Sequence, residues 1–194
     1  AKRKARLAQR KAKRLMSADH AEEKEEIKTH DINLRNMPLK FGVDRALGCY
    51  SALKTVKNES QKNIIIADCG TTLSLTKINS KGKIIGGQLS PGFRTQLNAM
   101  EENTKNLKSP DKLIIPKKQF LLSTKKAMLM GVYSGLIGAI DLSFSYKNDI
   151  LIICGGDAKI IGEAFLKRKG SIYIKPNLVM NGMILFHQSR KNYL

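Results

Sequence analysis

Residues 68–72 of the chain read DCGTT and stand between two β-rich runs, where a tight turn would connect two strands. The glycine of such a turn lets the backbone approach a phosphate, and threonine adds hydroxyl and amide donors. The aspartate can hold a cation or the waters around it. We interpret Asp68, Gly70 and Thr71 as a turn that handles phosphate and a cation. The alternative is an ordinary hairpin whose turn begins at an aspartate.

Residues 154–158 read CGGDA, follow a buried apolar run and precede a predicted helix. Gly155 and Gly156 would allow a nucleotide to lie against the backbone at the helix N-terminus. The pattern is not GxGxxG, however. A helix capped by Asp157 accounts for the same residues equally well.

A third segment, GVDR at residues 42–45, combines Gly42, Val43, Asp44 and Arg45. Adjacent residues on a helix do not share a face, so the aspartate and the arginine need not neutralise each other. One could act as a base while the other binds an anion. The alternative is a solvated pair of charges, which is what such dipeptides usually are. Two weaker segments are GGQLSPG at 86–92, which predicts a rigid loop, and Ser123-Thr124, which predicts a helix cap.

The elements that would position these segments follow a definite order. The sequence predicts a turn entering a helix at 41–57, then three antiparallel strands at 63–68, 73–78 and 83–86. Further on it predicts helices at 93–107 and 123–144, a strand at 149–154, a helix at 156–169, a strand at 171–174 and a helix at 177–188. Such an order predicts an α/β protein with a mixed sheet. It matches one ribonuclease-H-like unit of the kind duplicated in actin, sugar kinases and Hsp70.

Composition narrows the class of protein. The 194 residues predict one domain with a short appendage, and 42% apolar residues are enough for a core. No run approaches the ~18 apolar residues of a membrane span, and no signal peptide is evident. The three cysteines have no CxxC spacing, which argues against a disulfide framework or a zinc site and fits a reducing cytoplasm.

The formal charge of +19 divides unevenly along the chain. Residues 1–15 hold eight basic and no acidic residues, and residues 16–40 hold four basic and six acidic ones. We therefore expect a helical or disordered tail at 1–30 and a globular domain at 31–194. The tail could be a solvated linker or an arm that binds nucleic acid or a membrane surface. The remaining charge is spread thinly, which would attract anions such as ATP but indicates no nucleic-acid site.

Taken together and in order, the segments GVDR, DCGTT, GGQLSPG, Ser123-Thr124 before a Gly-rich helix, and CGGDA resemble the type III pantothenate kinases, also called the Bvg accessory factor family. The resemblance runs from about residue 32 to residue 186 and covers the second half of that family's fold. It implies transfer of the γ-phosphate of Mg-ATP to the terminal hydroxyl of pantothenate, the first step of coenzyme A biosynthesis.

The resemblance also implies a role for each motif residue. Asp44 would be the general base, and Asp68 would bind a monovalent cation, potassium or ammonium. The acceptor pantothenate would contact Gly42, Val43, Asp44, Arg45 and Thr124. ATP would contact Gly70, Thr71, Gly155 and Gly156. Members of the family dimerise, so we expect a homodimer, with the helix 123–144 and its glycines as a candidate contributor.

Two departures from the family pattern leave alternatives open. The family begins with a DxGNT loop that holds ATP phosphates, and nothing in residues 1–40 resembles it. DCGTT also replaces the more usual DAGTA. The chain is therefore either part of a pantothenate kinase or a non-catalytic binding or regulatory homologue of the same fold. A kinase for another acceptor, such as a sugar, is the third reading.

Overall fold

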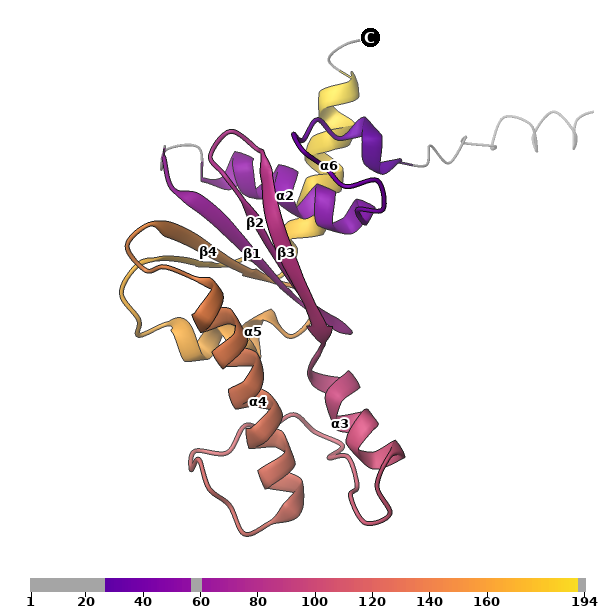
Figure 1. Ribbon diagram of the computed structural model, residues 1–194, viewed down its shortest axis with the longest axis vertical. Coiled ribbons are helices and arrows are strands. Elements are labelled where there is room, and N and C mark those ends of the chain that lie inside the picture. The colour runs from indigo at the N-terminus through magenta and orange to yellow at the C-terminus, as the bar shows by residue number, and fades with distance from the viewer. Residues whose placement is uncertain (1–26, 57–60, 192–194) are drawn as a thin grey trace, which may run out of the picture.

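The computed structural model describes residues 27–56 and 61–191 (Figure 1). The tail expected at 1–30 therefore lies almost wholly outside the described residues. In its last part, Thr29–Asp31 forms a single 3₁₀ turn, η1. A bridge between Arg35 and Lys83 then ties the segment after η1 to the sheet.

The elements of the domain follow the expected order. The strands are β1 (Asn63–Cys69), β2 (Thr72–Ile78), β3 (Ile84–Pro91), β4 (Asp149–Cys154) and β5 (Ser171–Ile174). The helices are α2 (Val43–Thr55), α3 (Phe93–Glu102), α4 (Thr124–Ser143), α5 (Ala158–Gly162), the 3₁₀ turn η2 (Glu163–Phe165) and α6 (Leu178–Lys191).

The strands form one five-stranded sheet in the order β3-β2-β1-β4-β5. β1 and β2 pair antiparallel, as do β2 and β3, while β4 pairs parallel with both β1 and β5. A tight turn suffices between antiparallel neighbours, whereas the parallel pairs need crossover helices, here α3 with α4 and then α5. The predicted mixed sheet is confirmed.

Alternate residues of the central strands point into two separate cores. On β1, Ile65 and Ala67 pack with residues of α3, α4 and α5, whereas Ile64 and Ile66 pack with residues of α2 and α6. Figure 1 shows α2 and α6 side by side, apart from α3, α4 and α5. The sheet thus has helices on both faces, and the face under α2 is the one that matters for the site.

Three predicted elements have the wrong bounds. The helix expected at 93–107 is shorter, because α3 ends at Glu102. The third strand does not end at Gly86; it stays paired with β2 through Pro91, so most of the expected rigid loop is strand. The helix expected at 156–169 is α5 plus η2, because a 3₁₀ turn at Glu163–Phe165 ends the regular helix. Among the described residues, no helix has both the length and the apolar character to cross a membrane.

Candidate active site

Three polar side chains form a row across the sheet where β1 ends. Asp68 on β1 is in register with Ser74 on β2 and with Cys154 on β4. Two residues earlier, Ile66 of β1 belongs to the core under α2, and side chains two apart point to the same face. The row therefore lies on the sheet face that α2 covers.

The pKa of Asp68 is raised, first by burial and then by the negative charge of Asp44. A hydrogen bond from the Cys154 thiol opposes these effects. Burial raises the pKa of Cys154 itself, so this thiol stays protonated and can donate. The GVDR motif also reaches this face of the sheet, since Arg45 donates to Thr76 on β2, two residues after Ser74, which opposes Asp68.

The CGGDA motif packs against the same carboxylate. A Cβ atom at Gly155 would contact Asp68 Oδ1 and would lie 2.5 Å from the Cys69 carbonyl oxygen. Gly155 also has φ +90°, a conformation that side chains rarely adopt. The structure therefore brings all three motifs to the end of β1. Gly156 is exposed, with open space where a side chain would begin.

Asp44 lies in the first turn of α2, which begins directly after Gly42. Its Oδ1 accepts a hydrogen bond from the Arg45 backbone N–H at 2.9 Å. A Cβ atom at Gly42 would lie 2.6 Å from that oxygen, so glycine leaves room for the carboxylate. Asp44 is exposed, and Val43 is 37% exposed. The carboxylate is thus anchored at one oxygen and open to a ligand.

The Arg45 side chain runs the other way, over the sheet. Its Nε and Nη2 both donate to the Thr76 hydroxyl at 3.1 Å, and the guanidinium lies 4.4 Å from the centre of the Phe41 ring. Within the described residues no ion pair includes Arg45. The prediction that Asp44 and Arg45 would not neutralise each other is consistent with this geometry.

The backbone of the DCGTT turn is fixed by hydrogen bonds from the start of α3. The Thr71 carbonyl accepts from the Gly92 N–H at 2.8 Å and from the Thr95 hydroxyl at 2.7 Å. Thr71 is exposed and Gly70 is half-buried. The turn is therefore fixed through its backbone while the Thr71 side chain faces solvent, as a phosphate-binding turn requires.

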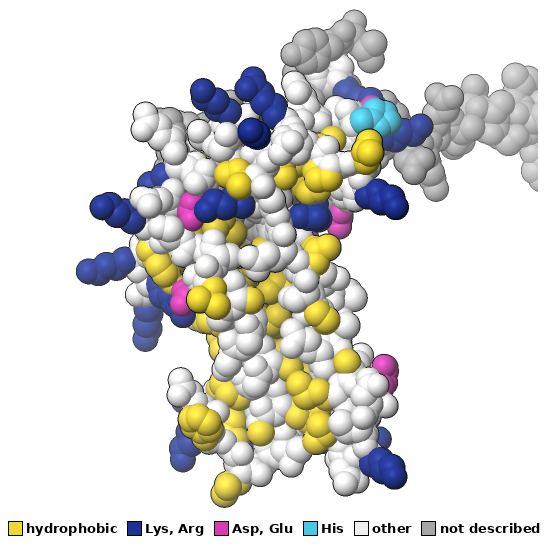
Figure 2. All heavy atoms as spheres, in the orientation of Figure 1, with side chains coloured by type: hydrophobic (Ala, Val, Ile, Leu, Met, Phe, Trp, Pro, Cys, Tyr) yellow, Lys and Arg dark blue, Asp and Glu magenta, His cyan; other side chains and the backbone are white. Residues whose placement is uncertain are grey.

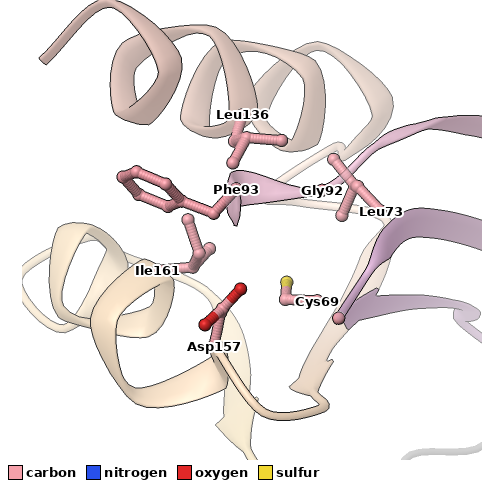
Figure 3. Close-up of a pocket in the computed structure, with 8 residues that line it drawn as sticks. Cys69, Leu73, Gly92, Phe93, Leu136, Asp157 and Ile161 are labelled. Carbon is pink, nitrogen blue, oxygen red and sulfur yellow. The ribbon is translucent and has the colours of Figure 1, made fainter. Parts of the chain in front are cut away.

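Under this turn lies a pocket of about 10 Å³, enclosed mainly by apolar side chains (Figure 3). Figure 3 shows Phe93, Leu136 and Ile161 on one side and Cys69 and Asp157 on the other. This volume is about that of one water position, so no part of a nucleotide fits inside. The pocket is part of the packing that supports the turn, and any nucleotide has to bind outside it.

Asp157 occupies the cap position of α5 but makes no capping hydrogen bond with its side chain. Its N–H instead donates to the Cys69 carbonyl at 2.9 Å, which ties the CGGDA motif to the end of β1. Burial raises the pKa of Asp157, and the charge of Arg94 opposes that rise.

Thr124 is the one predicted site residue that the fold does not bring to this cluster. It is exposed at the first turn of α4, at the end of that helix that points away from the sheet (Figure 1). Leu136 of α4 lines the pocket under the DCGTT turn, and Thr124 precedes it by 12 helical residues, a rise of about 18 Å.

Sequence reasoning missed three residues of the site: Ser74, Thr76 and Cys154. The Ser74 hydroxyl is buried and has no hydrogen-bond partner among the described residues. The signal that could have found Ser74 and Thr76 is the alternation of β2. Ser74 lies opposite Asp68 and shares its face of the sheet, and Thr76, two residues further along β2, shares it too. Their side chains are small and uncharged, so nothing in the sequence marks them as polar groups inside a site.

Comparison with known proteins gives a consistent result. A family model described as type III pantothenate kinase matches residues 2–145. The type III pantothenate kinase of Synechocystis sp. is 29% identical over 171 residues, covering 80% of this chain and 65% of that protein. The one from Legionella pneumophila strain Paris is 31% identical over 164 residues, covering 80% and 60%. The chain thus spans less than two thirds of the length of these relatives. The family match starts at residue 2, earlier than the motifs indicate.

Solved structures show the fold. A Baf-family protein of Campylobacter jejuni, described as a transcriptional activator, has a TM-score of 0.63 and 18% identity, covering 84% of this chain and 72% of that one. An archaeal actin homologue has a TM-score of 0.52 and 17% identity, covering 76% and 54%. The predicted ribonuclease-H-like fold, of the kind found in actin, is confirmed by these likenesses.

Proposed function

We propose, on the premise that this chain belongs to the type III pantothenate kinase family, that it takes part in ATP-dependent phosphorylation of pantothenate, the first step of coenzyme A biosynthesis. The observation that carries the proposal is the gathering of the motifs where β1 ends: Gly155 lies against Asp68, and Arg45, next to Asp44, donates to Thr76 on the neighbouring strand β2. A carboxylate open to solvent can act as a base, and a close backbone approach lets phosphates bind, and both suit phosphoryl transfer between two substrates.

In this proposal Asp44 is the general base. It takes the proton of the pantothenate hydroxyl as the bond to phosphorus forms, which requires a carboxylate within hydrogen-bond reach of that hydroxyl. The anchored oxygen of Asp44 fixes the orientation of the carboxylate, and its exposed position gives the acceptor access. Gly42, Val43 and Arg45 contact the rest of the acceptor, with the Arg45 charge directed to its carboxylate.

ATP binds on the other side of Asp44, against the backbone of two turns. Gly70 and Thr71 contact phosphate oxygens, and Gly155 and Gly156 let the nucleotide approach the strand ends. Mg²⁺, carried by the nucleotide, supplies neutralisation of the phosphate charge. Alignment and charge compensation are most of the catalysis that phosphoryl transfer requires.

Asp68 is the residue that we propose for a monovalent cation, potassium or ammonium. Two neighbouring carboxylates repel each other unless a cation lies near them, and the raised pKa of Asp68 reflects that repulsion after burial. The unpartnered Ser74 hydroxyl beside Asp68 offers a neutral oxygen. One carboxylate and one neutral hydroxyl carry a single negative charge between them, which suits a monovalent cation.

The test is ADP release from ATP, with and without pantothenate, in potassium buffer containing magnesium. We expect pantothenate-dependent turnover that Asp44→Asn abolishes and that Asp111→Asn, at an exposed residue outside the site, leaves unchanged. If the chain releases no ADP, the same assay is repeated after fusing a DxGNT-containing segment of a relative to its N-terminus. Absence of turnover in both forms would refute the proposal.

The cellular and oligomeric setting follows from the same family. We propose a cytoplasmic homodimer whose core is the domain at 31–194, with residues 1–30 as an appended tail. A second copy would also explain Thr124, which contacts pantothenate in our proposal but lies far from Asp44 in its own chain. Light scattering tests this state directly.

The second candidate is a non-catalytic binding homologue. It is favoured by the eight basic residues in positions 1–15 and by the description of one structural neighbour as a transcriptional activator. On the part of the surface seen in Figure 2, the described Lys and Arg side chains are scattered and form no single patch. In this candidate we assign the affinity to the basic residues of the tail. This candidate predicts DNA binding that weakens steeply with salt. No binding at low salt would exclude it.

A further inference from the structure

We propose that Thr76 and Gly87 are positioning residues that fix Arg45 as a carboxylate receptor, so that acceptors with a carboxylate are selected over their neutral analogues. This inference rests on the proposed function, because it concerns the acceptor side of the same site. Thr76 belongs to none of the motifs that identified the site, and Gly87 lies in the GGQLSPG segment, for which the sequence predicted only a rigid loop.

The guanidinium of Arg45 is held by two residues, Thr76 and Phe41. The Thr76 hydroxyl accepts from Nε and from Nη2 at 3.1 Å, which fixes one edge of the group. The Phe41 ring covers one face at 4.4 Å. Thr76 is 2% exposed and Phe41 5% exposed, so both partners are themselves immobilised in the core under α2.

Gly87 leaves room for the guanidinium. On β3 it pairs with Thr76, and a Cβ atom at this position would lie 2.5 Å from Arg45 Nη2 and 2.6 Å from the Leu75 carbonyl oxygen. Both separations are far below van der Waals contact, and the carbonyl oxygen belongs to the backbone of β2, so a side chain at position 87 would have to displace the guanidinium, the paired strand or both. The adjacent Gly86 has open space at the same point, so the requirement is specific to position 87.

This arrangement leaves a usable edge of the arginine. A guanidinium has five N–H donors, and Thr76 occupies only one on Nε and one on Nη2. The two on Nη1 and the second on Nη2 remain, and together they form the planar fork that binds a carboxylate with two hydrogen bonds. A preorganised fork loses little conformational entropy on binding.

The partner that fixes the arginine is neutral. Threonine orients the guanidinium without cancelling its charge, and no ion pair of Arg45 exists among the described residues. Burial raises the pKa of nearby Cys49 to about 12, against the influence of Arg45, so the thiol is uncharged as well. The positive charge is therefore available to an anionic group of the ligand.

The experiment compares the binding of pantothenate and of panthenol, the alcohol that lacks the carboxylate, by titration calorimetry. Wild type should bind pantothenate at least tenfold more tightly, since hydrogen bonds between charged groups are worth that much. Thr76→Val, which keeps the shape and removes the hydroxyl, should erase the preference by weakening pantothenate alone. Thr76→Ser, which keeps the hydroxyl, should retain the preference for pantothenate. Equal binding of the two ligands by wild type, or a preference that survives in Thr76→Val, would overturn the inference.

Two neighbouring glycines on β3, Gly86 and Gly87, allow a second and independent experiment. Gly87→Ala should lower the preference for pantothenate, whereas Gly86→Ala should not, and urea unfolding of both variants reports any loss of folding. Equal preference in the two variants would contradict the role of Gly87.

A nuclear magnetic resonance readout separates this inference from the proposed function. The Arg45 Nε–H signal should exchange slowly with water in wild type and Thr76→Ser and fast in Thr76→Val, with no ligand present. If the Arg45 Nε–H exchanges slowly but the protein does not bind pantothenate, the proposed kinase function is refuted and the positioning of Arg45 by Thr76 stands. If the Arg45 Nε–H exchanges fast in wild type, the positioning by Thr76 is refuted, and this result does not depend on the identity of the substrate.

Discussion

Asp68 and Ser74 oppose each other across the β1–β2 pair, and the Ser74 hydroxyl is buried with no hydrogen-bond partner among the described residues. An unpaired buried hydroxyl costs stability, so its presence beside the half-buried carboxylate of Asp68 needs a reason. The reason that we propose is a bound cation. A cation at Asp68 would be coordinated by the Ser74 hydroxyl oxygen, which would offset both the cost of the unpaired hydroxyl and the cost of the partly buried negative charge.

Replacing this serine tests that reason. In choline chloride, Ser74→Ala should be more stable than wild type by about 1 kcal/mol, because the unpaired hydroxyl is gone. In potassium chloride at the same concentration, wild type should gain stability and the variant should gain less. Urea unfolding in the two salts measures both effects, with lithium chloride as a second control. An equal potassium response in both proteins would remove Ser74 from the cation site.

Gly92 supports the DCGTT turn by having no side chain. A Cβ atom there would contact the Gly70 carbonyl and would lie 2.9 Å from the Thr71 carbonyl oxygen, and these backbone atoms cannot rotate away. We expect Gly92→Ala to destabilise the protein by about 1–3 kcal/mol, the usual cost of overpacking. It should also weaken nucleotide binding.

Thermal and urea unfolding measure the first effect, and titration with an ATP analogue measures the second. Gly86→Ala is the matched control, because nothing lies within 4 Å of its added methyl group. Wild-type stability in Gly92→Ala would contradict the support of the turn by this contact.

The elements of this fold were readable from the sequence because their signals are local. The apolar run Ile64–Ala67 and the alternation of β2 predict strands, and the glycine and apolar pattern of α4 predicts a helix. The bounds of β3 were not readable, since Gly86 and Gly87 weaken a strand on propensity and only pairing with β2 keeps them extended.

The site shows the same division between local and long-range information. The motif residues Asp44, Asp68 and Gly155 were predicted by type and spacing; the fold packs Gly155 against Asp68 and places Arg45, next to Asp44, on Thr76 of the neighbouring strand. The partners Thr76 and Cys154 were missed because their roles depend on cross-strand register, which a single sequence does not display. Thr124 was found by its motif, yet its distance from Asp44 depends on the direction of α4, which is set by packing.

The raised pKa of Asp157 makes a pH-dependent prediction. As pH rises past the ordinary aspartate pKa of about 4, the unfolded chain releases this proton before the folded chain does, so folding becomes less favourable. Asp157→Asn removes the ionisation and should therefore be more stable than wild type at pH 7, with the difference shrinking toward pH 3.5. Urea unfolding at several pH values gives the difference. A difference that grows as pH falls would show that burial does not dominate at Asp157.

The open face of α4 makes the prediction about assembly. Gly131, Gly135 and Gly138 have no atom within 4 Å of the point where a side chain would begin, although the helix is otherwise rich in apolar residues. Glycines cost helix stability, roughly 1 kcal/mol each relative to alanine, so three on one face are better explained by close approach of another surface than by the helix itself. If that surface is a second copy, its α4 would also carry Thr124 toward the acceptor site of the first.

We therefore expect Gly135→Leu to convert a dimer to a monomer. The variant monomer should still fold, since the added side chain meets open space within its own chain. Light scattering at several concentrations measures the mass, and pantothenate-dependent turnover should fall with the dimer. Lys147→Leu, on an exposed residue outside α4, controls for added apolar surface. A wild-type protein that is monomeric at all concentrations would refute this assembly, and the glycine face would then have to serve a different partner.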